Sequence, residues 1–252
     1  MSAQELPHEV RVAHGLEEAA RRGPKPGLSL EAITAAGIRL ADADGLAGVS
    51  MAKVAKELGV TTMALYRYVE SKDALVRLMA DSTVSTLRDY PAGPAWKDGL
   101  RQWTLDVIDN AMSHPWVAEL PITGGPLLPG SLTFLDRALA ILDGQPLDLG
   151  EKLSTVMLLS GHARTEAVMW SQIAASRAAA GVSDVQADTD YAEQLAFVVS
   201  PERFPTLHRE VSAGGFSEGI GDQDDDAEMR SFGLERILDG LEAHIAQRHA
   251  GG

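Results

Sequence analysis

The chain has 252 residues, of which 45% are apolar and 5% aromatic, with a net charge of −14 and no cysteine. This apolar content is sufficient for a sizeable core, and the lack of cysteine excludes disulfides, thiolate catalysis and thiolate metal ligands. No apolar run reaches the ~18 residues of a membrane span, so we expect a cytoplasmic protein with no membrane contact.

The first segment, residues 1–28, is predicted to be a flexible basic arm. It ends in "RRGPKPG", in which prolines and glycines interrupt regular structure and three cations add positive charge.

Four short helices are predicted next, each with its own start and stop signals. Ser29 caps a helix that ends near Gly45, and Ser50 caps a second that Gly59 closes. A third helix follows in "GVTTMALYRYVESKDAL", and Ser71 caps a fourth that extends to about residue 87.

Beyond this region, "DYPAGPAW" indicates a linker, and apolar residues again recur at helical spacing. Helices are predicted at about 96–112, 130–143, 148–180 and 228–248, with a break in the acidic, glycine-rich segment 212–226. Because the spacing is three and four residues throughout, the predicted fold class is all-α.

The third predicted helix has an unusual outward face. Small residues at Ala55 and Gly59 allow it to cross the second helix closely, and this turns a polar set away from the core. Thr61, Thr62 and Met63 suit base edges in a DNA major groove, whereas Tyr66, Arg67 and Lys72 can reach phosphates. The alternative is an ordinary helical hairpin, with threonines as caps and tyrosines in the core.

The charge distribution favours the DNA interpretation. Residues 21–90 hold ten Lys and Arg against eight Asp and Glu, whereas the rest of the chain holds twelve against twenty-eight. A weakly basic face on an acidic body would limit the surface that DNA can contact.

Residues 29–80 resemble the TetR family of bacterial transcriptional regulators. The resemblance lies in "GLAGVSMAKVAKELGVTTMALYRYVESKDAL", with its glycine-valine turn, Leu-Tyr, aromatic pair and lysine before the fourth helix. It implies a three-helix, helix-turn-helix DNA-binding domain at 29–75 and a helical ligand-binding and dimerisation domain at 76–252. By resemblance, the DNA-contacting positions are Ser50, Thr61, Thr62, Met63, Tyr66 and Lys72.

Two departures from the family pattern stand out. Ala52 occupies a position where many relatives carry arginine, which weakens any base contact from the second helix. Tyr68 and Val69 replace a common histidine-phenylalanine pair.

The order "W…HPW…GGP…FLDRALAILDG…GEKLSTVMLLSGHARTEAVM" is similar to a tetracycline-repressor-type C-terminal domain. This implies a homodimer formed through helices near 148–180 and 228–248, and a near-palindromic DNA operator. The expected apolar stripes of these helices are Leu153, Met157, Ser160 and Arg164 on one, and Leu234, Ile237, Leu238, Leu241 and Ile245 on the other.

An unknown small-molecule effector is expected to bind in this C-terminal domain and to release a repressor from its operator. The candidate ligand-binding residues, each of which could instead be plain core, are Trp103, Phe134, Met157, His162, Glu166, Met169 and Trp170. Alignment with the tetracycline repressors places Arg88, Trp103 and Pro121 where those proteins hold the drug and magnesium, so tetracycline-magnesium is not the expected effector.

Enzymatic motifs are missing from the sequence. "GGPLLPGS" lacks the lysine of a phosphate loop, and "DQDDDA" lacks the glycine and glutamate of a calcium loop. We therefore expect no catalytic residues, metal site or cofactor. Two alternatives stay open, a ligand-independent dimeric DNA-binding protein and a helical enzyme, and the sequence leaves the effector, the operator and the sign of regulation undefined.

Overall fold

The computed structural model describes residues 6–17, 28–85, 88–121, 124–216 and 223–251, which form twelve α-helices and contain no strand. The all-α prediction is therefore confirmed over this part of the chain. The chain divides into two compact units, the first comprising residues 1–168 and 244–252 and the second residues 169–243. Each unit is described by itself.

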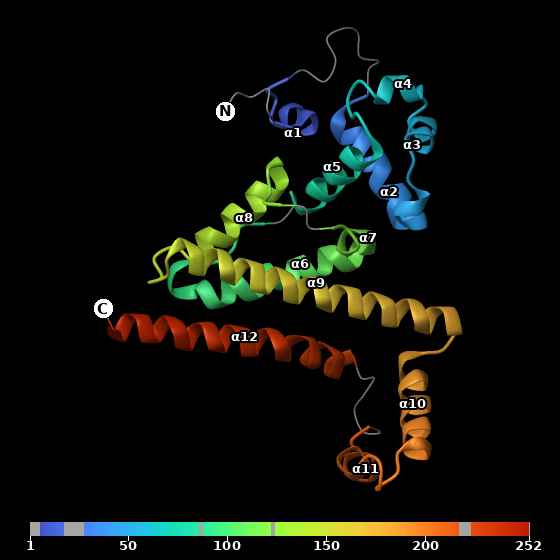
Figure 1. Cartoon of the computed structure of the whole chain (residues 1–252), viewed down its shortest axis with the longest axis vertical. Coiled ribbons are helices and arrows are strands. Elements are labelled where there is room, and N and C mark those ends of the chain that lie inside the picture. Colours follow the sequence, from blue (N-terminus) through green and yellow to red (C-terminus); the bar gives the residue numbers. More distant parts are fainter. Residues whose placement is uncertain (1–5, 18–27, 86–87, 122–123, 217–222, 252) are drawn as a thin grey trace. The chain divides into compact units, whose positions relative to one another are not determined.

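The first unit, shown in Figure 1, begins with α1, and the four helices α2 to α5 follow before the linker. Their bounds are α1 (His8–Ala13), α2 (Leu30–Gly48), α3 (Met51–Glu57), α4 (Thr62–Leu65), α5 (Lys72–Val84), α6 (Trp96–Ser113), α7 (Pro115–Ala118), α8 (Pro129–Ile141) and most of α9 (Leu149–Ala180). A 3-10 turn, η2 (Gly93–Ala95), precedes α6.

Local signals in the sequence account for the boundaries of α2 to α5. Ser29, Ser50, Thr61 and Ser71 each accept a hydrogen bond from the backbone N–H three residues on, which satisfies a helix-start donor. Gly45 adopts φ +67°, which breaks the helical path of α2 where its end was predicted, although helical hydrogen bonding continues to Gly48.

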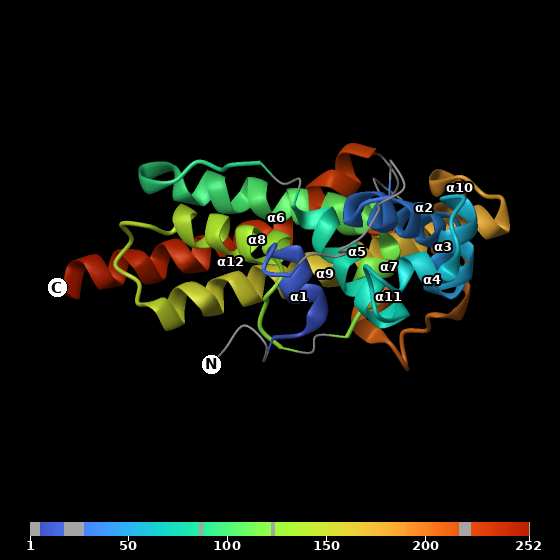
Figure 2. The ribbon, with the colours of Figure 1, turned by 90° about the horizontal axis from the view of Figure 1, so that it is seen from above.

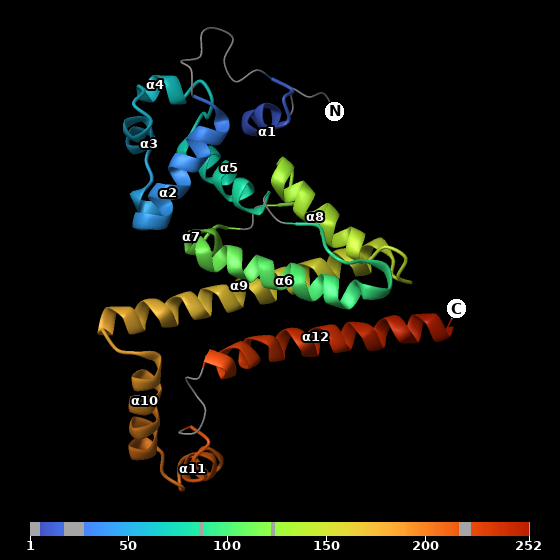
Figure 3. The same cartoon turned by 180° about the vertical axis from the view of Figure 1, so that it is seen from behind.

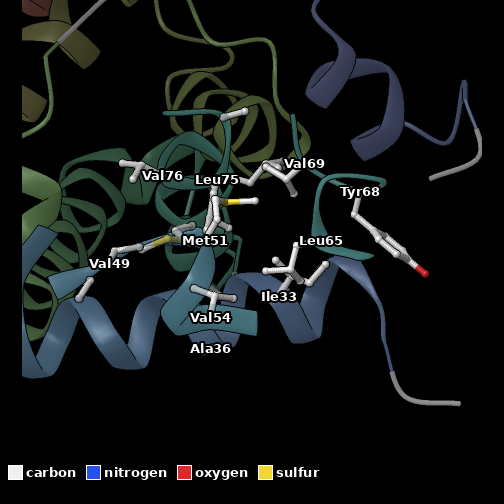
Figure 4. Close-up of a cluster of buried hydrophobic side chains, with 14 of the residues drawn as sticks. Ile33, Ala36, Val49, Met51, Val54, Leu65, Tyr68, Val69, Leu75 and Val76 are labelled. Atoms are coloured by element: carbon white, nitrogen blue, oxygen red, sulfur yellow. The ribbon is translucent and has the colours of Figure 1, made fainter. Parts of the chain in front are cut away.

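A single core holds α2, α3, α4 and α5 together. Ile33, Val54 and Leu65 are fully buried in it, as Figure 4 shows, and Leu75 from α5 closes the cluster. At Gly37 a Cβ atom would lie 2.6 Å from the Met79 sulfur, so α2 and α5 cross at close range because this position has no side chain.

The helices after the linker form a second part of the same unit. Seen from above in Figure 2, α6 and α8 run side by side. Trp103 of α6 and Leu159 of α9 are fully buried. These helices match the predicted ranges 96–112, 130–143 and 148–180 to within three residues at each end.

The second unit contains α10 (Asp184–Val198), α11 (Pro205–Ser212) and the greater part of α12 (Gln223–Gly251). Neither α10 nor α11 was predicted from the sequence. No residue of either helix is buried in the single chain.

Two expectations need correction, and a third stays untested. The arm at 1–28 is not irregular over residues 8–13, because "HEVRVA" forms α1 and buries Glu9 and Val10; residues 18–27 lie outside the described part. The break expected at 212–226 ends earlier, since α12 begins at Gln223. The unit boundary falls inside α9 and α12, so the domain limits at 28, 75 and 76 stay predictions.

Candidate DNA interface and ligand-binding residues

The turn between α3 and α4 is built around Gly59. Its φ of +65° lies in the left-handed region, Gly59 N donates to the Lys56 carbonyl at 3.2 Å, and Val60 N donates to the Ala55 carbonyl at 2.9 Å. These two bonds form a Schellman motif, which ends α3 sharply and sets the direction of α4.

The outward face of α4 carries the residues predicted to contact DNA. Met63 is 74% exposed and Tyr66 45% exposed, which is unusual for large apolar side chains. Thr61 and Arg67 are exposed as well, and Thr62 is half-buried. Four of the seven predicted residues, Thr61, Met63, Tyr66 and Arg67, are therefore exposed to solvent, and a fifth, Thr62, is half-buried.

The two remaining predicted residues have structural contacts of their own. Ser50 accepts a hydrogen bond from Lys53 N at 3.2 Å and so caps α3. The Lys72 ammonium donates to the Leu46 carbonyl at 2.8 Å, next to the Gly45 break in α2. Because an ammonium has three donors, Lys72 can hold this carbonyl and still offer a proton to a phosphate.

The inner face of the same segment fixes its position. Val69 is fully buried, and Tyr68 is 8% exposed with its hydroxyl donating to the Leu28 carbonyl at 3.2 Å. Figure 4 shows the Tyr68 ring extending away from the centre of the cluster, towards the start of α2. Tyr68 thus links the α4 segment to the chain that enters α2, a contact that sequence reasoning did not anticipate.

Three of the predicted ligand-binding residues lie in the first unit in apolar surroundings. The Trp103 and Phe134 rings are 4.6 Å apart between centroids, and Trp103 has no exposed surface. The Trp103 Nε1 and His162 Nε2 atoms are buried and have no hydrogen-bond partner. Buried polar atoms are almost always paired, so both atoms are candidates for contact with a bound molecule.

Arg137 was missed by sequence reasoning. It lies three residues after Phe134 on α8 and therefore on the same side of that helix. Its Nε forms an ion pair with Asp89 at 3.2 Å, but its Nη1 is buried without a hydrogen-bond partner. Its spacing of three residues from Phe134, a predicted ligand-binding residue, is the one sequence signal that could have identified Arg137.

The other predicted ligand-binding residues have different surroundings. Met157, predicted to line a largely apolar pocket, is 75% exposed in the single chain. Met169 is 42% exposed, and Glu166 and Trp170 are half-buried with partners of their own. Met169 and Trp170 fall in the second unit.

Arg88, which aligns with a drug-binding position of the tetracycline repressors, is held by Asp106. Its guanidinium donates to both Asp106 oxygens, at 2.8 and 3.1 Å, and the Tyr90 hydroxyl donates to the same carboxylate at 3.0 Å. Burial is the main cause that raises the pKa of Tyr90, followed by this bond to Asp106, so Tyr90 stays neutral and a donor.

Several residues of the apolar stripes predicted for the dimer interface already have contacts within the single chain. Leu234, Leu238 and Ile245 of α12 are buried within the single chain, and Arg164 donates to the Leu120 carbonyl at 2.7 Å. Of the expected α9 stripe, Met157 is exposed, and the neighbouring Leu158 and Gly161 are exposed as well.

Within the described ranges, no group of three or more His, Cys, Asp or Glu residues could hold a metal ion. No helix in that part of the chain is long and apolar enough to cross a membrane.

A short, outward-facing helix that follows a tight turn and is held by a core of neighbouring helices is the arrangement of helix-turn-helix DNA-binding proteins. Residues 33–79 match the family model of bacterial regulatory proteins of the tetR family, and residues 90–245 match the tetracyclin repressor-like C-terminal domain. The chain belongs to the tetR family, and the resemblance seen in the sequence is confirmed. Members of this family regulate transcription, so the chain is a transcriptional regulator and not an enzyme.

Individual relatives agree with this assignment. The chain is 32% identical over 234 residues to the HTH-type transcriptional repressor DrrR1 of Streptomyces coeruleorubidus, covering 90% of this chain and 82% of that one. It is similar in fold to the Streptomyces coelicolor TetR family protein ActR in complex with actinorhodin, with a TM-score of 0.69 and 24% identity over 87% of this chain and 98% of ActR. A TetR from Acinetobacter baumannii shares the fold at a TM-score of 0.55 and 16% identity, covering 86% of this chain and 98% of that one.

Proposed function

We propose that the protein is a homodimeric repressor that binds a near-palindromic operator and leaves it when a small molecule binds. The outward face of α4 carries this proposal, because exposed Met63 and Tyr66 on a short capped helix have no role in the core. Similarity to a repressor at 32% identity supports the sign of regulation.

The DNA contacts divide by side-chain chemistry. Thr61, Thr62 and Met63 at the start of α4 would face base edges in the major groove, where hydroxyl groups donate or accept and a thioether contacts the thymine methyl. Tyr66, Arg67 and Lys72 would contact phosphates and fix the register of α4. Ser50 would act through the start of α3, which it caps.

The exposed face of α9 supports the homodimer. Met157 and Leu158 are 75% and 56% exposed, and Gly161 beside them has no atom within 4 Å of a built Cβ. Two large apolar side chains next to a glycine allow a second helix to approach closely and bury them. Two copies related by a two-fold axis would present two α4 helices to adjacent half-sites.

The effector we propose is an aromatic molecule that carries oxygen acceptors. Trp103 and Phe134 supply aromatic surface, whereas Trp103 Nε1 and Arg137 Nη1 are buried donors without a partner. His162 Nε2 can donate or accept according to its tautomer. ActR binds actinorhodin, and this likeness in fold makes aromatic, oxygen-rich compounds of that kind the first to test.

The ligand proposal is tested by titrating the protein with actinorhodin and with anthracene, which has aromatic rings but no oxygen, and following thermal stability. We expect actinorhodin to raise the midpoint of unfolding and anthracene to raise it less. Arg137→Gln should reduce the actinorhodin shift, whereas Arg203→Gln in the second unit should leave it unchanged. Equal shifts in both arginine variants would contradict the role of Arg137.

A ligand-independent DNA-binding protein is a distinct outcome of the same design. If operator binding by the wild type is unchanged at ligand concentrations that saturate the thermal shift, release by this ligand is ruled out. Only a ligand with different affinities for two conformations can alter DNA affinity.

A further inference from the structure

Two charged residues one turn apart on α5 contact two different parts of the first unit. The Arg77 guanidinium donates through Nε to the Glu9 carboxylate of α1 at 3.0 Å. Asp81 accepts bonds from Gly130 N at 2.9 Å, Ser131 N at 2.6 Å and Ser131 Oγ at 2.7 Å, which lie at the start of α8. Asp81 thereby caps α8 from another helix.

A third contact connects α1 directly to the segment before α8. The His14 ring donates through Nε2 to the Leu127 carbonyl at 2.8 Å, two residues before α8 begins. Figure 3 shows α1 next to α5 and the first turn of α8, and Figure 1 agrees. The three contacts join α1, α5 and α8 in a closed triangle.

The joint is tightly packed as well as polar. A Cβ atom at Gly130 would lie 2.2 Å from the Asp81 backbone carbonyl, so α5 and α8 meet where no side chain fits. Val10 of α1 is 6% exposed and belongs to the core that holds α2 to α5. Residues 8–13 lie outside both matched family regions, 33–79 and 90–245.

We propose that α1 is a brace that fixes the angle between α5 and α8, so that movement of the ligand-binding helices is transmitted to α4. Asp81 and the close packing at Gly130 hold α5 against the start of α8. The Arg77–Glu9 and His14–Leu127 contacts add two further points of attachment, and three points define an angle. This inference rests on the proposed function, because transmission matters only for a ligand-responsive regulator.

Glu9 is the residue on which the brace depends most. Its side chain is 8% exposed and its charge is met by Arg77, so removing that charge leaves a weak neutral bond in place of an ion pair. Burial raises the pKa of Glu9, but the hydrogen bonds and positive charge of Arg77 outweigh this and lower it overall.

The angle can be measured without DNA or ligand, because the chain has no cysteine. Spin labels are attached at Lys56→Cys on α3 and Asp136→Cys on α8, which are both exposed positions. Pulsed electron paramagnetic resonance then measures the distance between the labels, across the contact between α5 and α8. Labelled chains are mixed with an excess of unlabelled chains, so that only distances within one chain contribute.

We expect a single narrow distance distribution for the wild type and a broader, shifted one for Glu9→Gln. Glu119→Gln is the control, because Glu119 is an exposed carboxylate outside α1, α5 and α8. If Glu9→Gln does not fold, His14→Ala removes an exposed contact of the brace and should broaden the distribution less. Distributions identical to wild type in both brace variants would overturn the proposal.

Operator binding separates this proposal from the proposed function. If the wild type binds no promoter fragment, the regulator itself is refuted, whatever the distances show. If the wild type binds and Glu9→Gln binds about five-fold more weakly, the brace is supported. A five-fold change in affinity is about the smallest that coupling between two sites typically produces. Unchanged binding together with an unchanged distance distribution refutes the brace and leaves the repressor intact.

Discussion

Individual side chains in this protein show how one carboxylate can serve several elements. Glu151 accepts from Asp148 N at 2.9 Å, and Asp148 accepts from Glu151 N at 2.8 Å, so the two form a capping box at the start of α9. The same carboxylate contacts Arg248 and His244 of α12. The bond from Arg248, followed by that from the Asp148 backbone, lowers the pKa of Glu151 to about 2.

This lowered pKa predicts a specific loss of stability in acid. A carboxyl whose pKa falls on folding stabilises the native state above its unfolded pKa, here 4.5, and loses that contribution as the pH falls towards about 2. The free energy of unfolding, measured in urea, should therefore fall more steeply between pH 7 and pH 3 for the wild type than for Glu151→Gln. The exposed residue Glu119 gives the control, since Glu119→Gln should follow the wild type. Parallel curves for Glu151→Gln and wild type would contradict the assignment.

Elements of the DNA-binding part follow from short-range signals. Serine or threonine caps start α2 to α5, and Gly59 ends α3, so each boundary is encoded within a few residues. The helices α10 and α11 lack buried residues and were missed. The outward face of α4 could be predicted from local sequence too, because its polar residues interrupt the apolar spacing that marks the core.

The polar joints could not be predicted, because their partners lie far apart in the sequence. Arg77 and Glu9 are separated by 68 residues, and Asp81 and Gly130 by 49. Asp42 likewise accepts from His114 at 2.8 Å and from Trp116 Nε1 at 2.7 Å, although "HPW" in the sequence indicates only a break. Pairings of this kind depend on how helices pack, which local patterns do not determine.

The Gly59 turn can be tested as an element. Gly59→Ala places a Cβ in the left-handed region, which costs about 1–2 kcal/mol, and should lower the free energy of unfolding by that amount. Gly59→Asn is the matched variant and should cost less, because asparagine tolerates this conformation. Denaturant unfolding measures both, and equal losses would show that the left-handed backbone is not the cause.

At the scale of the whole molecule, charge and symmetry restrict how DNA can be approached. The net charge is −14, yet residues 21–90 have a small excess of cations. An acidic body repels phosphates, so only the α4 face of each subunit would come near the duplex. Two such faces would give tight, selective binding, so the proposed dimer would form part of the DNA site.

The dimer face predicts a charge-substitution result. Met157→Glu adds a carboxylate to a residue that is 75% exposed in the single chain, so a monomer tolerates it, whereas a dimer buried there would not. Size-exclusion chromatography with light scattering should show a dimeric wild type and a mainly monomeric variant. Val185→Glu on α10, also exposed at 62%, should stay dimeric. A dimeric Met157→Glu would place the interface elsewhere.

The central claim is that α4 reads operator DNA, and fluorescence anisotropy with fragments of the protein's own promoter tests it most directly. We expect a sequence-selective complex that weakens as salt rises, and a salt slope smaller by about 1 for Arg67→Ala, as loss of one phosphate contact requires. Met63→Ala should instead reduce discrimination between operator and unrelated DNA with little change in slope. A wild type that binds all fragments equally, or none, would contradict the account.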